Sequence, residues 1–374
     1  MIMKLSSLVT SVSSVHDPRR QYGNIRHKLI DILVIGLLST LCGGKDFACM
    51  QVFGEAKQTW LSKFLELANG IPDDETFRRI FERVNPDELT KCLNEWLLST
   101  RNPFFALKTI NIDGKTMRGS LNVYRDARHV VSAWAGDIGI TLGQVCCDEK
   151  SNEITAIPQL LDIIDVRGAV VTIDAMGCQK KIAAKIISLD ADYLLNLKAN
   201  HKKLYAAATE LFECVDAGQD DQCLDVYEYS TNGHGRIENR IIDVVSADNI
   251  PNKSDWQNLQ SIARIRYTSV CKKSGNQTLQ VRYFLTSLPA NARRLSYVIK
   301  SHWSIESHLH WMLDVVFEED KSKAKKDNSP LNLNVLRKVA LSILIHKKDK
   351  RTSYKKMMFR AGLDEEYLEM VLFG

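Results

Sequence analysis

The sequence predicts an α/β protein with a mixed-sheet core that contains a β-rich insertion and follows an all-helical N-terminal domain. Three observations lead to this fold class. Apolar residues recur at helical spacing through the first hundred positions. From Lys108 onward, short apolar runs of strand length alternate with helical patterns. Between residues 223 and 288, four longer runs separated by polar turns interrupt that alternation.

Composition and charge are those of a globular protein. The chain has 374 residues, 45% hydrophobic and 25% charged, which leaves room for two or three domains. Its net charge of +5 permits an acidic partner without proving one. Nine cysteines without a Cys-x-x-Cys motif argue against a disulfide framework or a structural zinc site. The strongest apolar run, at 29–42, is too short to cross a bilayer, and no signal peptide precedes it, so we expect a soluble, cytoplasmic protein.

The N-terminal domain, residues 1–105, is expected to contain four helices. The first fills 30–41 and ends at Gly43-Gly44, and the second runs near 47–67. The third and fourth begin after the proline-led segments at Pro72 and Pro86.

The core, residues 106–346, opens with strands and then alternates strands with helices. Strands are expected at 109–112, 128–135, 140–147, 169–173 and 193–197, with a glycine turn joining the second and third. Helices are expected at 157–164, after Cys178, and at 202–214. Three antiparallel strands followed by this alternation match the element order of the ribonuclease H-like fold.

The β-rich insertion is expected at about 215–290. Its four strands are predicted at 224–229, 236–246, 261–271 and 279–286. Long helices follow at 293–317 and 333–345, and a basic C-terminal segment occupies 347–374.

Asp113 is the first candidate functional residue. It follows the short strand directly and precedes Gly114, Lys115 and Arg118. A carboxylate at a strand tip can stay solvated and hold a metal ion, while Gly114 allows a ligand to come close and the two cations suit a phosphate. On its own, the Asp-Gly pair more often marks a turn.

Asp174 repeats this pattern at the end of the run 169–173, with Gly177 three residues on. In this strand order the two strands are neighbours, so Asp113 and Asp174 should lie side by side at the carboxyl ends of strands, where ligands bind. The alternative is that Asp174 caps the helix that follows it.

Glu306 is the third candidate, on the helix at 293–317. It lies at the edge of a buried face, with His302 and His310 one turn away on either side. The ordinary alternative is a solvated glutamate. The spacing of His302, Glu306 and His310 is not that of the His-Glu-x-x-His zinc motif. Three carboxylate ligands favour Mg²⁺ or Mn²⁺ instead. Such ions can activate a water or a 3′-hydroxyl in phosphoryl transfer.

Five strings carry a family resemblance that covers nearly the whole chain. They are Ile112-Asp-Gly-Lys-Thr-Met-Arg-Gly-Ser120, Thr172-Ile-Asp-Ala-Met-Gly-Cys-Gln179, Ala191-Asp-Tyr-Leu-Leu-Asn-Leu-Lys198, Gly233-His-Gly-Arg-Ile-Glu238 and His302-Trp-Ser-Ile-Glu306. With these strings the sequence resembles the H-repeat-associated transposases, a branch of the bacterial insertion-sequence DDE transposases. The helical leader at 17–88 resembles the domain that precedes the core in that family.

The resemblance implies a ribonuclease H-like catalytic core in which Asp113, Asp174 and Glu306 are the DDE carboxylates and the ligands of a Mg²⁺ or Mn²⁺ cofactor. It also implies cleavage of double-stranded DNA at terminal inverted repeats and strand transfer into target DNA. The helical domain would then bind DNA ends or support the core. In one departure, Ala199-Asn200-His201 replaces the usual Gly-Asn-Gln.

Basic residues are the expected DNA contacts, because neutralised phosphates supply most sequence-independent affinity. The expected contacts are Lys115, Arg118, His302, Lys321, Lys323, Lys347, Lys348, Lys350 and Arg351. Leu313 stands where related transposases place a lysine, and Lys321 or Lys323 is the candidate replacement. For an isolated basic run, a solvated tail is the ordinary interpretation. For Trp303 the two alternatives are a contact with the DNA strand end and packing within the protein, and packing is the expected one.

Three functions remain open on the sequence. The first is a DDE transposase, the second a catalytically inactive, repurposed DNA-binding protein on the same fold, and the third a metal-dependent nuclease that does not rejoin ends. Retention of all three acids favours an enzyme, since a pure DNA binder does not need them. Because two element ends must be held together, we expect a homodimer on DNA, without a membrane, in the bacterial cytoplasm at the nucleoid.

Overall fold

The computed structural model describes residues 2–20, 25–100, 108–122, 126–147, 152–218, 225–233, 235–348 and 351–373. The predicted DNA contact Lys350 lies outside these ranges. The chain forms two compact units. The first combines Met1–Phe105, Gly114–Lys150 and Glu306–Gly374, and the second combines Ala106–Asp113 and Ser151–Ile305. Within the described ranges, none of the helices has the length and apolarity that crossing a membrane requires.

A nine-stranded mixed sheet confirms the α/β class, in the order β3-β2-β1-β4-β5-β9-β8-β7-β6. The strands are β1 (Thr109–Thr116), β2 (His129–Ala135), β3 (Ile140–Cys147), β4 (Val170–Ile173), β5 (Asp192–Leu197), β6 (Asp225–Gly233), β7 (Arg236–Ser246), β8 (Ser261–Cys271) and β9 (Gln277–Thr286). Strands β1, β4 and β5 run parallel to one another. Strand β2 pairs antiparallel with β3, and each neighbouring pair in the series β5-β9-β8-β7-β6 is also antiparallel. Because β9 pairs with β5, the predicted insertion extends the core sheet.

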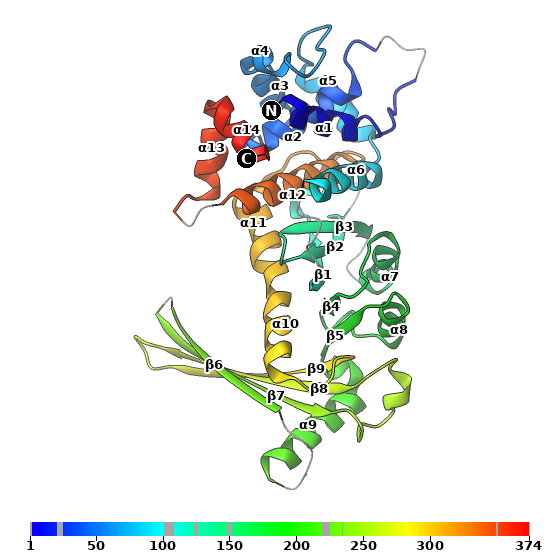
Figure 1. The fold of residues 1–374 in the computed structure, drawn as a ribbon, viewed down its shortest axis with the longest axis vertical. Coiled ribbons are helices and arrows are strands. Elements are labelled where there is room, and N and C mark those ends of the chain that lie inside the picture. Colours follow the sequence, from blue (N-terminus) through cyan, green and yellow to red (C-terminus); the bar gives the residue numbers. More distant parts are fainter. Residues whose placement is uncertain are drawn as a thin grey trace. The chain divides into compact units, whose positions relative to one another are not determined.

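In the second unit, helices cover both faces of the sheet. Helix α10 (Ala292–Ser304) lies on one face, and α7 (Glu153–Ile163) and α8 (Lys180–Ser188) lie on the opposite face (Figure 1). Under α10, Val170 and Leu194 of the core strands pack with Phe284 of β9 and with apolar residues of the helix. Helix α9 (Lys202–Asp216) packs its Phe212 ring 5.8 Å from the ring of Tyr283. This burial fixes α10 against β4, the strand that precedes Asp174.

The first unit is mainly helical, as predicted for the N-terminal segment. Its helices are α1 (Ile2–Val12), α2 (Leu29–Leu41), α3 (Phe47–Ala56), α4 (Gln58–Leu61), α5 (Asp74–Arg83), α6 (Pro86–Ser99), α11 (Trp311–Val315), α12 (Ser329–Lys347), α13 (Tyr354–Leu363) and α14 (Glu365–Phe373). The side chain of Asp73 caps α5, and that of Asn85 caps α6. Three features were not predicted: α1, the break between α3 and α4, and the two helices of the basic segment.

Helix α12 is buried along almost its whole length in the first unit. Its Lys338 is 4% exposed, and the ammonium donates to Ser132 Oγ at 2.8 Å and to Gln144 Oε1 at 2.6 Å. Burial lowers the pKa of Lys338 to about 7, against a smaller opposing effect of Glu319. The hairpin of β2 and β3 is therefore tied to α12 by a lysine that titrates near neutral pH.

Candidate active site

Asp113 and Asp174 occupy matching positions on two paired strands. Strands β1 and β4 pair in parallel from Thr109↔Val170 to Ile112↔Ile173, so Asp113 and Asp174 each follow the last paired residues, Asp113 within β1 and Asp174 just beyond the end of β4. Because this register is one to one, the two aspartates come at the same level along the paired strands. The prediction that these strands are neighbours is confirmed.

The local setting of Asp113 differs from the prediction. Strand β1 continues through Asp113 and Gly114 to Thr116, so neither residue forms a turn. Only β4 ends at this level, at Ile173. Asp113 is partly buried inside a continuous strand, which fixes its backbone on both sides.

Asp174 caps the turn that follows β4. Its Oδ1 accepts hydrogen bonds from the backbone N–H of Met176 at 3.0 Å and of Gly177 at 3.3 Å. A Cβ on Gly177 would lie 2.2 Å from Ile173 Cγ2, so this turn requires glycine. The next helix, α8, begins only at Lys180. Asp174 therefore caps a turn rather than the predicted helix, and the cap uses Oδ1.

A buried polar cluster lies directly behind the two aspartates. Asn111 and Thr172, each two residues before an aspartate, are both fully buried. The Thr172 hydroxyl donates to Asn111 Oδ1 at 2.8 Å. Asn111 Nδ2 donates to Ser304 Oγ at 3.2 Å, and Ser301 Oγ donates to Asn111 Oδ1 at 3.3 Å. The two aspartate-bearing strands are thus hydrogen-bonded to each other and to α10.

His302 completes this polar cluster. Its Nδ1 lies 2.8 Å from Thr172 Oγ1. Because the Thr172 proton is already donated to Asn111, Nδ1–H is the donor to Thr172. Burial lowers the pKa of His302 to about 4, against a smaller opposing effect of Asp174, so the ring is neutral at pH 7. His302 was predicted to contact DNA. The structure gives it a contact with β4, and the DNA contact stays a prediction.

Glu306 follows His302 by one helical turn. It is exposed, and it lies in a π-helical turn, Ile305–His310, which separates α10 from α11. The sequence predicted one continuous helix here. Single π-helical turns inside a helix occur frequently at functional sites. The anchoring of Ser304 and His302 on β1 and β4 fixes the helix up to the residue before this turn.

The polar cluster is the part of the site that sequence reasoning missed. A signal was present, since Asn111 and Thr172 interrupt apolar strands at the position two residues before each aspartate. Residues two apart share one face of a strand, so these polar side chains had to face the same way as the acids. The partners of Asn111 and Thr172 on α10 lie at least 130 residues away in sequence.

The predicted basic contacts fall into different surroundings. Lys321 is 78% exposed in its side chain, and Lys323 and Arg351 are also exposed. The Lys348 ammonium lies 5.3 Å from the centre of the Tyr354 ring. By contrast, the side chain of Lys115 is only 10% exposed and pairs with acidic residues.

Arg118 and Trp303 also contact other residues of the protein. The backbone N–H of Arg118 donates to Asp320 Oδ1 at 3.2 Å. Trp303 is 43% exposed, with the guanidinium carbon of Arg282 4.5 Å from its ring centre. Trp303 therefore forms a cation–π pair at the surface instead of packing in the core.

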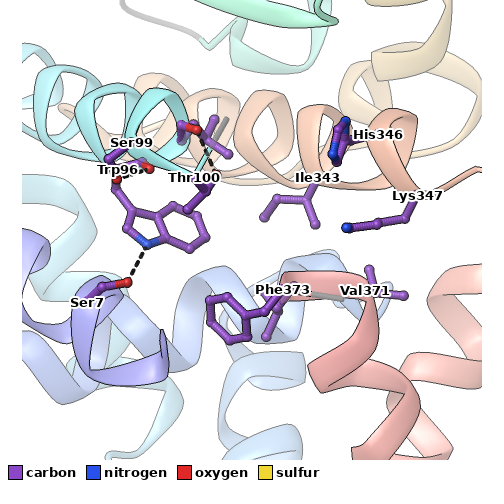
Figure 2. Close-up of a pocket in the computed structure, with 11 residues that line it drawn as sticks. Ser7, Trp96, Ser99, Thr100, Ile343, His346, Lys347, Val371 and Phe373 are labelled. Atoms are coloured by element: carbon purple, nitrogen blue, oxygen red, sulfur yellow. Dashed lines mark hydrogen bonds between the residues drawn. The ribbon is translucent and has the colours of Figure 1, made fainter. Parts of the chain in front are cut away.

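Lys347 lines a separate pocket of the first unit, between α1, α6, α12 and α14. The pocket has a volume of about 360 Å³. Figure 2 shows His346 and Lys347 on α12 at one end and Trp96, which donates to Ser7 Oγ at 3.3 Å, at the other. None of the three predicted carboxylates lines it.

Across the described part of the chain, no three His, Cys, Asp or Glu side chains gather closely enough to hold a metal ion. The chemistry of the predicted donors suits a hard cation, because all of them are carboxylates, and two of these follow the last paired residues of β1 and β4.

The comparison with known proteins gives the class of the protein. A family model described as "Transposase DDE domain" matches residues 107–343, and one described as "DDE_Tnp_1-associated" matches residues 9–97. The chain therefore belongs to the DDE transposase family, and its expected substrate is DNA.

Relatives that match over their full length show to which branch of the DDE transposase family the chain belongs. "Putative transposase YncI" of Escherichia coli O157:H7 is 34% identical over 376 residues, covering 99% of this chain and 95% of the relative. "H repeat-associated putative transposase YhhI" of Escherichia coli (strain K12) is 33% identical over 378 residues, covering 100% and 99%. The resemblance to the H-repeat-associated transposases is confirmed.

Proposed function

We propose that Asp113, Asp174 and Glu306 hold Mg²⁺ or Mn²⁺ and that the chain uses it to cut DNA at terminal inverted repeats and to join the cut ends to target DNA. The observation that carries the proposal is the register of β1 and β4, in which the last paired residues, Ile112 and Ile173, are each followed by an aspartate. When bound, the metal would activate a water or a 3′-hydroxyl and stabilise the leaving oxygen.

The protein's own contribution is to position these three acids. The two backbone N–H groups at Asp174 Oδ1 orient its carboxylate. The polar cluster of Asn111, Thr172 and His302 holds the helix that leads to Glu306 on the strands that carry the aspartates. Because His302 is neutral, the cluster adds no positive charge that would oppose a bound cation.

We further propose that the core is ribonuclease H-like. Support comes from the strand order β3-β2-β1-β4-β5 with parallel β1, β4 and β5. In this scheme residues 1–105 bind DNA ends or support the core domain at 106–346, and the basic segment at 347–374 contacts the DNA backbone. The exposed Lys321, Lys323 and Arg351 suit that contact. Work on chromosomal DNA would place the chain at the bacterial nucleoid.

The test is cleavage of a duplex that carries the element's inverted repeat, with Mg²⁺ or Mn²⁺. The wild type should nick the repeat end, and D113N, D174N and E306Q should each lose more than roughly 100-fold in rate. D165N is the matched control, because Asp165 is an exposed aspartate that pairs with Arg167. Full activity in any of the three variants would contradict the assignment.

Two further measurements separate the alternatives. Joining of pre-cut ends to a target plasmid supports the transposase, whereas cleavage without joining indicates a plain nuclease. Specific binding of the repeat without metal-dependent cleavage indicates a repurposed DNA-binding protein. Light scattering of the complex should give two chains for each pair of ends, and one chain would refute the homodimer.

A further inference from the structure

Lys115, two residues beyond Asp113 on β1, is surrounded by carboxylates. Its ammonium nitrogen lies 2.8 Å from Asp314 Oδ1, 3.4 Å from Glu319 Oε2 and 3.6 Å from Asp320 Oδ1. The charge of Lys115 is therefore neutralised within the protein, which disfavours a phosphate as its partner.

The carboxylate of Glu319 is buried and held by hydrogen bonds. Its side chain is 1% exposed, and Oε1 accepts from Asn334 Nδ2 at 2.8 Å and from Arg337 Nη1 at 3.4 Å. Both donors belong to the buried helix α12. Separating a buried carboxylate from its partners would leave an uncompensated charge, so Glu319 stays bound to α12. Lys115 therefore pairs with a carboxylate whose position is fixed.

The backbone beside Lys115 is held by the same acidic segment. The Arg118 N–H donates to Asp320 Oδ1. A Cβ on Gly119 would lie 2.6 Å from the carbonyl oxygen of Glu319 and 3.1 Å from that of Asp320, so only glycine allows this approach. The turn that follows β1, at Arg118 and Gly119, therefore packs closely against the segment 319–322.

We propose that Lys115 is a positioning residue, which through Asp314 and Glu319 joins the strand that carries Asp113 to the helix that follows Glu306. The inference rests on the proposed function of those two acids. Lys115 is two residues from Asp113 on one continuous strand. Asp314 follows Glu306 by eight residues, about two helical turns, in the same helical segment. A metal that needs both acids then depends on this ion pair.

This role and a phosphate contact make opposite predictions for K115M. A positioning residue affects metal affinity in the absence of DNA. A phosphate contact affects DNA affinity without metal and lowers the salt dependence by about one ion. K115M keeps an unbranched side chain only one atom shorter than that of lysine and removes the charge, so it separates the two roles.

The experiment is Mn²⁺ binding to the full-length chain, measured by electron paramagnetic resonance without DNA. K115M should weaken Mn²⁺ binding roughly 10-fold, and D314N should weaken it in the same direction. K45M is the matched control: Lys45 pairs at 2.9 Å with Glu318, the neighbour of Glu319, and is 55% exposed. K45M should bind Mn²⁺ like the wild type.

The outcomes separate the two proposals. If the wild type binds no Mn²⁺, or D113N binds it as well as the wild type, the proposed function fails. If D113N loses binding while K115M and D314N keep it, only the role of Lys115 is overturned. A fall in DNA affinity with unchanged Mn²⁺ binding in K115M would identify a phosphate contact. If circular dichroism shows that K115M does not fold, D314N decides, because Asp314 is 35% exposed.

Discussion

Replacing Thr172 with valine removes the hydroxyl that connects the two aspartate-bearing strands to α10. Valine has nearly the same shape and the same preference for strands, so β4 should keep its backbone. The hydroxyl donates to Asn111 Oδ1 at 2.8 Å and accepts from His302 Nδ1 at 2.8 Å. The substitution therefore acts on hydrogen bonding and leaves packing almost unchanged.

The expected loss follows from these two contacts. Each hydrogen bond contributes about 1 kcal/mol net, and a buried donor left unpaired at His302 adds a further desolvation penalty. The Ser301 hydroxyl, 3.3 Å from Asn111 Oδ1, has a single proton and lies closer, at 2.8 Å, to the carbonyl oxygen of Val298, so it compensates little for the loss at Asn111. T172V should therefore lower the local stability of β4 and α10 by about 2–3 kcal/mol.

Native-state hydrogen exchange, followed by mass spectrometry on peptides from β4 and α10, measures this loss directly. The matched control is T141V in β3. Thr141 is 3% exposed, and its hydroxyl has no hydrogen-bond partner among the described residues. T141V should leave the exchange of β4 and α10 unchanged. Equal protection in T172V and T141V would refute the claim that the hydroxyl holds α10 on the sheet.

Three further predictions concern titration and close packing. Folded His302 has a pKa of about 4, so between pH 6.5 and 4 only the unfolded state gains its proton, and the wild type should lose about 3 kcal/mol that H302Q does not lose. Folded Lys338 has a pKa of about 7, so from pH 7 to 9 the unfolded state holds more protons, and the wild type should gain about 2 kcal/mol relative to K338M. Urea unfolding across pH checks both, and parallel pH profiles of wild type and variant would contradict either. G119A should lower stability by about 1–3 kcal/mol because its Cβ would lie 2.6 Å from the Glu319 carbonyl oxygen. G233A, whose Cβ meets no described atom within 4 Å, is its control, and equal urea midpoints would contradict the clash.

Local patterns in the sequence were sufficient for the paired strands. The runs that became β1 and β4 are short, apolar and β-branched, which is typical of buried parallel strands. The sequence predicted that these two strands are neighbours, which the structure confirms, and the register itself came from the structure. The end of β1 was wrong, because Gly114 and Lys115 look like a turn locally but continue the strand.

Long-range polar pairing could not be read in the same way. The contact between Thr172 and His302 joins residues 130 positions apart, and that between Lys115 and Asp314 joins residues 199 positions apart. Neither periodicity nor composition specifies such partners. The helices α13 and α14 were hidden by the exposed basic residues of their segment, although Met357 and Leu368 form a buried apolar side.

Asp113, Asp174 and Glu306, which are distant in sequence, are proposed to form one metal-binding site. Replacing Mg²⁺ with Fe²⁺ and adding ascorbate and peroxide generates radicals at the bound ion, which cut the nearby backbone. Mass spectrometry of the fragments should show cuts beside Asp113, Asp174 and Glu306, all suppressed by excess Mg²⁺. Cuts beside the two aspartates with none beside Glu306, or cuts that Mg²⁺ does not suppress, would contradict the account.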